Sequence, residues 1–116
     1  MSARVTAPSR QLTERGMLMT VTTGLLVLVE AQQGKEAELA AFLEQGRELA
    51  SAEAETVTWY AFRIDDRRFG IFDTFESEHG RQAHLSGPIA AALGEITPTL
   101  LAQPPEIQKV DVLAVK

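Results

Sequence analysis

An unbroken apolar run near the start of the chain constrains the fold most strongly. Residues 23–31 contain the stretch LLVLV, which has no polar member. Side chains alternate between the two faces of a strand, so a strand that is apolar throughout must be covered on both faces. The run therefore predicts a strand that is central in its sheet or lies at an interface.

The next stretch changes from strand to helix periodicity. Apolar residues recur at helical spacing after Gly34 and predict a helix over residues 35–52. The apolar face of this helix contains Leu39, Phe42, Leu43, Gly46, Leu49 and Ala50. Gly46 lowers the helix propensity, but it lets the helix approach a sheet closely because it has no side chain.

A β-hairpin is predicted in the middle of the chain. Residues 56–63 and 68–75 are both rich in threonine or aromatic residues, and Asp65 and Asp66 between them are typical turn residues. A helix is then expected to begin near Glu78, with Ser77 as its cap.

Proline and glycine divide the last third of the chain. Gly87 ends the helix that Ser77 caps, and Pro88 is placed where proline starts a new helix. Pro98 indicates a restart for one more turn, and residues 104–105, both proline, end helical structure. Residues 106–115 are expected to form a closing strand.

These elements follow the order βαββαβ, with the second helix broken. That order is typical of an α+β, ferredoxin-like fold, in which the helices cover one face of the sheet. Because the first strand is apolar on both sides, we expect the other face to pack on a second copy of the chain. The sequence therefore predicts a homodimer.

The length of 116 residues corresponds to one domain. Residues 1–19 are expected to be a disordered tail or leader, and residues 20–116 the folded domain. The basic start, followed by an apolar stretch and Ala31, also has the outline of a signal peptide. Three threonines interrupt that stretch, however, and cleavage there would delete the best strand candidate. Met1, Met17 and Met19 are alternative starts.

Charge and composition exclude several classes of function. The net charge is −5, which disfavours nucleic acid and anionic membranes as partners. The chain has no cysteine and two histidines, so disulfides, thiolate nucleophiles and a metal site are not expected. This composition is compatible with a cytoplasmic protein.

Three motifs carry a family resemblance: TVTWYAFR at residues 56–63, FGIFDTF at residues 69–75, and HLSGP at residues 84–88. Over residues 23–116 the chain resembles the antibiotic biosynthesis monooxygenase family, in particular its quinol-monooxygenase-like branch. In many members an aromatic residue, usually tryptophan, ends the third strand, and a histidine follows nine residues later. Phe75 and His84 match these positions.

The resemblance implies a dimeric α+β barrel with a pocket between sheet and helices. It also implies oxidation of a small aromatic or quinol-type compound by molecular oxygen, without metal or flavin. Phe75 replaces the usual tryptophan, and no asparagine stands where haem-degrading relatives carry one, which disfavours haem degradation. The alternative is a non-catalytic ligand-binding or stress-associated protein that keeps the barrel and the pocket.

His84 is the candidate catalytic residue. Oxygenation without a cofactor requires a deprotonated substrate, and a histidine with an ordinary pKa near 6.5 is a suitable base near neutral pH. The alternative is that His84 makes a structural hydrogen bond at the helix break. His79 lies about 500° of helix rotation away, so it is expected to be solvated and not to pair with His84.

The candidate substrate-binding residues come from the hairpin and are Trp59, Phe75, Tyr60, Arg63 and Asp73. Trp59 and Tyr60 are neighbours on a strand, so at most one of them lines a given pocket wall, and a core role remains open for each. For Arg63 and Asp73 a simple ion pair across the hairpin is favoured over ligand binding.

Overall fold

The computed structural model describes residues 11–13, 17–19 and 21–116. Its main sheet has four antiparallel strands in the order β4-β5-β3-β6. These strands are β3 (Thr23–Glu30), β4 (Thr56–Arg63), β5 (Arg68–Phe75) and β6 (Glu106–Asp111). The apolar run of β3 is central in the sheet, as predicted.

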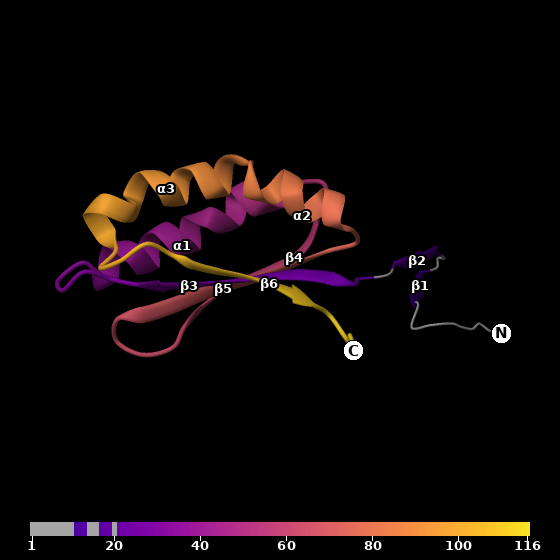
Figure 1. Cartoon of the computed structure of the whole chain (residues 1–116), viewed down its shortest axis with the longest axis horizontal. Helices are drawn as coiled ribbons and strands as arrows, with labels where there is room; N and C mark the ends of the chain where they lie inside the picture. The colour runs from indigo at the N-terminus through magenta and orange to yellow at the C-terminus, as the bar shows by residue number, and fades with distance from the viewer. Residues whose placement is uncertain (1–10, 14–16, 20) are drawn as a thin grey trace.

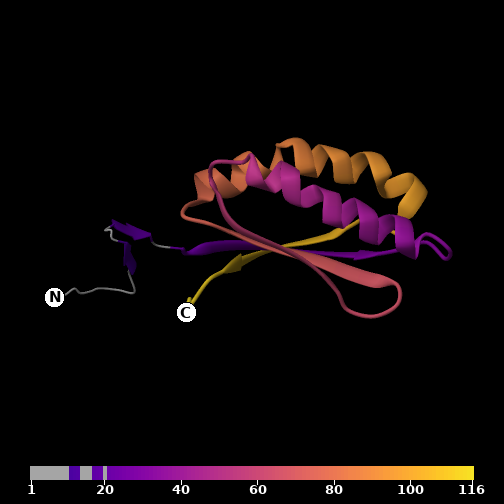
Figure 2. The ribbon, with the colours of Figure 1, turned by 180° about the vertical axis from the view of Figure 1, so that it is seen from behind.

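Three helices lie on one face of this sheet (Figure 1). They are α1 (Glu36–Ser51), α2 (Glu78–Leu85) and α3 (Pro88–Leu100). The βαββαβ order and the α+β ferredoxin-like class are therefore confirmed, including the break between α2 and α3 at Gly87. The view turned by 180° agrees: no helix among the described residues lies over the opposite face of the sheet (Figure 2).

The core lies between the helices and the inward face of the sheet. Leu25, Val27 and Val29 of β3 are all at most 6% exposed, whereas Leu26 and Leu28 between them are half-buried on the open face. The other buried apolar residues that complete this core are Ala31, Leu39, Leu43, Phe69, Ile71, Phe75, Leu93 and Leu101. One side of the apolar run is thus covered within the chain, and the other side is not.

Two local predictions hold at the helices. Ser77 accepts a hydrogen bond from the backbone N–H of Gly80 (3.4 Å) and caps α2. Gly46 is buried on the sheet side of α1, where an added Cβ would lie 3.3 Å from the ring of Trp59. The missing side chain therefore brings α1 close to β4.

Two predicted boundaries are wrong. α3 continues through Pro98 as one helix, without a restart. Proline removes the bond to the carbonyl of Gly94, but the Thr97 hydroxyl donates to the carbonyl of Leu93 (2.7 Å) in that turn. β6 ends at Asp111 and not at residue 115, because its pairing with β3 stops opposite Thr23, the first residue of that strand.

The N-terminal segment contains two short strands that the sequence pattern did not predict. β1 (Gln11–Thr13) pairs antiparallel with β2 (Met17–Met19) in a separate two-stranded sheet. Most of the predicted tail or leader, residues 1–10 and 14–16, lies outside the described residues. The division at residue 19 stays a prediction.

A buried arginine fixes α2 on the sheet. The Arg81 guanidinium donates through Nη1 to the carbonyls of Gly24 (3.0 Å) and Val110 (3.2 Å), and through Nη2 to Glu78. It therefore connects α2 to β3 and β6 at once. No helix among the described residues is long and apolar enough to cross a membrane, and the cytoplasmic location stays a prediction.

Candidate active site

An apolar cavity of about 230 Å³ lies between α1, α3 and the sheet. Its walls come from two helices and from the inward faces of β4 and β5. They consist of Phe42, Leu43, Gln45, Gly46, Leu49, Trp59, Ile71, Ile89 and Ala92. No wall residue is charged. Since a cavity of about 150 Å³ accommodates benzene, this one has room for a compound of one or two rings.

Trp59 forms the strand-side wall of the cavity. Its ring atoms Cζ2 and Cη2 face Gly46 on α1, so the helix holds the indole in place. The indole Nε1 is buried and has no hydrogen-bond partner. An unpaired buried N–H costs free energy.

A charged cluster lies at the α2 end of the same sheet face. His84 Nδ1 is 2.7 Å from Glu53 Oε1, and His84 Nε2 is 2.9 Å from Asp73 Oδ2. Asp73 is fully buried, His84 is 6% exposed, and the Phe75 ring lies 5.4 Å from the imidazole, centroid to centroid. We call Glu53, His84 and Asp73 the buried triad.

The two carboxylates determine the protonation state of His84. Burial by itself lowers the pKa of His84, but the contacts with Asp73 and Glu53 outweigh it and raise the pKa to about 9. His84 is therefore an imidazolium near neutral pH, and both of its nitrogens are occupied. The prediction of a base with an ordinary pKa near 6.5 is wrong, because the sequence did not reveal the two carboxylates around the ring.

The buried triad is incompletely satisfied. Glu53 Oε1 also accepts from the Thr56 hydroxyl (2.8 Å), but Glu53 Oε2 is buried without a partner. Neither oxygen of Asp73 accepts a hydrogen bond of good geometry among the described residues, so its contact with His84 is an ion pair and not an aligned hydrogen bond. In the described part of the chain, no group of His, Asp and Glu has the arrangement of a metal site.

The hairpin separates the predicted binding residues into different environments. Trp59 lines the cavity, whereas its neighbour Tyr60 is 60% exposed on the open face, so only one of the two lines this cavity. Asp73 lies directly opposite Trp59 in the pairing of β4 with β5 and on the same face. Phe75 is buried against His84 and is not a wall of the cavity. Tyr60 and Phe75 were predicted to bind substrate, but neither lines this cavity.

The predicted ion pair between Arg63 and Asp73 does not form. Arg63 pairs in register with Phe69, stacks on its ring (4.6 Å to the centroid) and donates to the carbonyl of Asp66 (3.4 Å). Four residues of register therefore separate it from Trp59, the residue opposite Asp73. The prediction named adjacent strands correctly but not which residues face one another.

Sequence reasoning missed Glu53. It lies in the connection between α1 and β4, a segment whose acidic residues look like an ordinary solvated turn. No pattern in the sequence pointed to it, because the burial of His84 and Asp73 depends on tertiary packing. His79 is 83% exposed at its side chain, so the prediction that it is solvated is confirmed.

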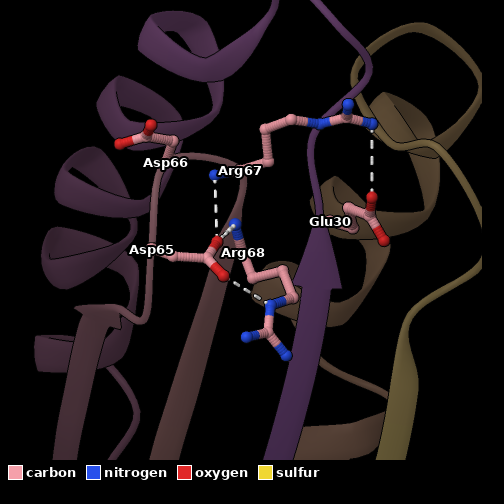
Figure 3. A pocket seen from close by; sticks show the side chains of 5 residues that line it. All are labelled: Glu30, Asp65, Asp66, Arg67 and Arg68. Carbon is pink, nitrogen blue, oxygen red and sulfur yellow. Dashed lines mark hydrogen bonds and ion pairs between the residues drawn. The ribbon is translucent and has the colours of Figure 1, made fainter.

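A second hollow, of about 500 Å³, lies at the far end of the hairpin (Figure 3). Its charges pair with one another: Arg67 with Glu30 (3.2 Å), and Arg68 with Asp65 (2.8 Å). Asp65 also accepts from the backbone N–H groups of Arg67 and Arg68 (3.1 and 2.9 Å), which closes the turn. These side chains stabilise the hairpin end, and the interior cavity is the better candidate for a ligand.

A solved structure is similar to this chain in both sequence and fold. NE2512 from Nitrosomonas europaea, a protein of unknown function, is 48% identical, with a TM-score of 0.82; the match covers 84% of this chain and 94% of that protein. The chain belongs to the same family as NE2512. No family model matches the chain, and no curated protein matches its sequence.

Two more distant structures identify the fold. One, from Nitrosomonas europaea, is described as a "putative antibiotic biosynthesis monooxygenase"; it is 13% identical, covers 79% of this chain and 99% of its own, and has a TM-score of 0.71. Another of that description, from Chloroflexus aurantiacus, is 21% identical, covers 82% and 96%, and has a TM-score of 0.65. The chain therefore has the antibiotic biosynthesis monooxygenase-like fold that the sequence motifs indicated. At these identities the likeness concerns the fold alone.

Proposed function

We propose that the chain binds a flat aromatic or quinol-type molecule in the cavity beside Trp59 and oxidises it with molecular oxygen, without a metal or flavin. The observation that carries the proposal is the cavity itself, which is apolar, uncharged and sized for one or two rings. The fold shared with the monooxygenase-like structures supports the reaction type.

The proposed reaction is balanced by the substrate and oxygen alone. A hydroquinone and one O2 give a hydroxyquinone and one water: one oxygen atom enters the ring, and the other leaves as water. The quinol supplies the electrons, and loss of its hydroxyl proton is what makes electron transfer to oxygen feasible. The protein needs to bind the ring, keep water away and accept that proton.

His84 is the proposed base, but in the folded chain it is mostly protonated near neutral pH. An imidazolium cannot accept a proton, so the base would be the small neutral fraction of His84 below its pKa of about 9. If His84 is the base, kcat/KM should rise about tenfold per pH unit above pH 7 and level off near pH 9. A profile without this limb would remove His84 from the reaction.

A second candidate function is ligand binding without oxygen chemistry. The observation that favours it is the buried triad, because both nitrogens of the one buried histidine are engaged. Under this alternative the triad is purely structural, and the cavity holds its ligand unchanged.

Two measurements on one sample separate these functions. The chain has a single tryptophan, so its fluorescence reports occupancy of the cavity wall. An oxygen electrode reports turnover of the same quinols and anthrones. Fluorescence change with stoichiometric oxygen uptake supports the oxygenase, and fluorescence change without uptake supports the binding protein. No change in either signal across the panel would contradict both.

We also propose that the chain forms a homodimer through the open face of its sheet. Tyr60 and Phe62 are 60% and 37% exposed there, next to the half-buried Leu26, Leu28 and Phe72. An apolar surface of this kind on an isolated chain is unfavourable in water.

Two glycines support the same proposal. A Cβ at Gly70 would overlap the Phe62 ring, and one at Gly24 would lie 3.2 Å from the Phe72 ring. The absence of these side chains lets both rings lie flat on the sheet, which suits close approach of a second sheet. Sedimentation should give twice the chain mass of 12.7 kDa, and a stable monomer at micromolar concentration would contradict the dimer.

A further inference from the structure

The cavity between α1, α3 and the sheet has a buried end and an exposed end. Leu43, Ile71 and Ile89 at the buried end are at most 4% exposed. Gln45 and Leu49, both on α1, are the two wall residues that are exposed. They are four residues apart and therefore lie on adjacent turns of one helix face. The cavity thus opens to solvent beside these two side chains, and we call this opening the mouth.

Gln45 is the polar side chain that a ligand at the mouth can reach. Among the nine wall residues, only Gln45 and Trp59 have a polar side-chain atom. The Nε1 atom of Trp59 is buried in the protein, out of reach of a ligand, whereas Gln45 is exposed. The carboxamide of glutamine both donates and accepts hydrogen bonds, so it can pair with a hydroxyl group or with a carbonyl oxygen.

The polarity of the walls determines how a ligand is oriented. A ring at the buried end contacts Leu43, Ile71 and Ile89. A hydroxyl group placed there would lose its hydrogen bonds with water and gain none from these side chains. At the mouth the same hydroxyl group keeps contact with solvent and can pair with Gln45. The favoured pose therefore places the ring inward and the oxygen at the mouth.

The charges of the two flanking helices act against an anionic ligand. α1 contains four glutamates and one arginine, and α3 contains Glu95 as its one charged residue. Arg47 is two residues from Gln45, so it points to another side of α1, where it lines a separate hollow beside β4. The acidic helices would repel an anion, and no wall residue of the cavity offers it a positive charge.

We infer that the cavity selects an uncharged ring compound with a hydroxyl or carbonyl group at one end, and that Gln45 recognises this group at the mouth. The inference rests on the ligand-binding function proposed above and adds the residue that recognises the ligand. Gln45 acts as a specificity-determining residue: it contacts the polar group of the ligand, while the apolar walls hold the ring.

The test compares 2-naphthol, naphthalene and 2-naphthoate, which share one ring system and differ in the attached group. At neutral pH the first two are uncharged and the third is an anion. NMR titrations of the full chain give the three dissociation constants. 2-Naphthoate should bind the wild-type chain at least about tenfold more weakly than 2-naphthol.

A substitution at the mouth tests the role of Gln45. Gln45→Met keeps the length of the side chain but loses the carboxamide, so the ratio of 2-naphthol affinity to naphthalene affinity should fall about fivefold. Gln33→Met is the matched control, because Gln33 is an exposed glutamine in the turn before α1 and is not a wall residue. It should leave the ratio unchanged. An unchanged ratio in Gln45→Met would overturn the inference, and so would 2-naphthoate binding as tight as that of 2-naphthol.

The unmodified chain offers a second readout. Because the chain has no asparagine, every side-chain NH2 resonance pair in a 15N-labelled sample belongs to a glutamine, and Gln45→Met assigns the pair of Gln45. 2-Naphthol should shift this pair, and naphthalene should shift it much less. A pair that stays in place while the methyl groups of Ile71 and Ile89 report bound 2-naphthol would contradict recognition by Gln45.

The failure of the inference is distinguishable from the failure of the proposed function. Binding of 2-naphthol at Ile71 and Ile89 without a shift of Gln45 leaves ligand binding in place and rejects the inference. The absence of binding by all three compounds rejects both. Recognition by Gln45 without oxygen uptake from any quinol rejects the oxidation alone.

Discussion

Two histidines on α2 contact carboxylates of the same connecting segment, and they differ in almost everything else. His79 lies 3.6 Å from Glu55, with side chains 83% and 50% exposed. His84 lies 2.7 Å from Glu53, with side chains 6% and 14% exposed, and has Asp73 on its other nitrogen. Exposed pairs contribute about 0–1 kcal/mol, whereas removal of one partner from a buried pair costs about 3–5 kcal/mol. Burial, and not the type of residue, thus separates a surface contact from a structural anchor.

The largest expected effect comes from removing the buried imidazolium. His84→Ala leaves Glu53 and Asp73 buried without their shared cation, so the free energy of unfolding should fall by about 3–5 kcal/mol. In a domain of this size that corresponds to a drop in Tm of more than about 10 °C. His79→Ala is the control and should change the free energy by less than about 0.5 kcal/mol. Equal effects of the two substitutions in thermal melts would contradict the distinction between the pairs.

The pH dependence of stability should carry the signature of His84. The pKa of His84 is about 9 in the folded chain and 6.5 in the unfolded chain. The stabilisation that the protonated ring provides is therefore fully present below pH 6.5 and is lost as the pH rises to 9. The loss should amount to about 3 kcal/mol over this window. Denaturant titrations at pH 6.5 and 9 measure it.

The control for this pH effect is His84→Gln. Glutamine cannot titrate, so the difference between wild type and variant isolates the contribution of His84 from all other groups. If the wild-type curve and the variant curve run parallel between pH 6.5 and 9, His84 does not bind an extra proton in the folded state.

A smaller effect is expected from the carboxylates of the connecting segment. Glu53→Gln keeps the shape of the side chain but removes one of the two negative charges that contact His84. The free energy of unfolding should therefore fall by about 1–2 kcal/mol. Asp73 remains to pair with the imidazolium, which is why the effect is smaller than that of His84→Ala. Glu55→Gln, the matched substitution in the exposed pair, should be within about 0.5 kcal/mol of wild type. A larger loss from Glu55→Gln than from Glu53→Gln would reverse the assignment.

The sequence predicted the features that depend on a local pattern, and it missed those that depend on contacts between distant segments. Periodicity specified the central strand, the two hairpin strands and the helix with Gly46, because each depends on local pattern and on one face being buried. The absence of a side chain at Gly46 predicted a close approach of the helix to the sheet, and the structure shows it at Trp59. Each of these features is determined largely by the residues of its own segment, so the sequence can predict it.

The site depends on contacts between distant segments. Glu53, Asp73 and His84 come from a connecting segment, a strand and a helix, and 20 or 31 residues separate Glu53 from the others in sequence. No local pattern marks a glutamate in an acidic turn as the partner of a histidine on a later helix. The register of the hairpin was equally hidden, since a shift of four residues decides whether Asp73 faces Arg63 or Trp59.

The central claim is that His84 is a buried imidazolium held between two carboxylates, and an NMR pH titration of the histidine side chains tests it most directly. The chain has two histidines, so His79→Gln assigns both sets of resonances. We expect the His84 ring to remain protonated through neutral pH and to titrate near pH 9 in the folded chain. A His84 ring that is neutral at pH 7 and titrates near 6.5 would contradict the account.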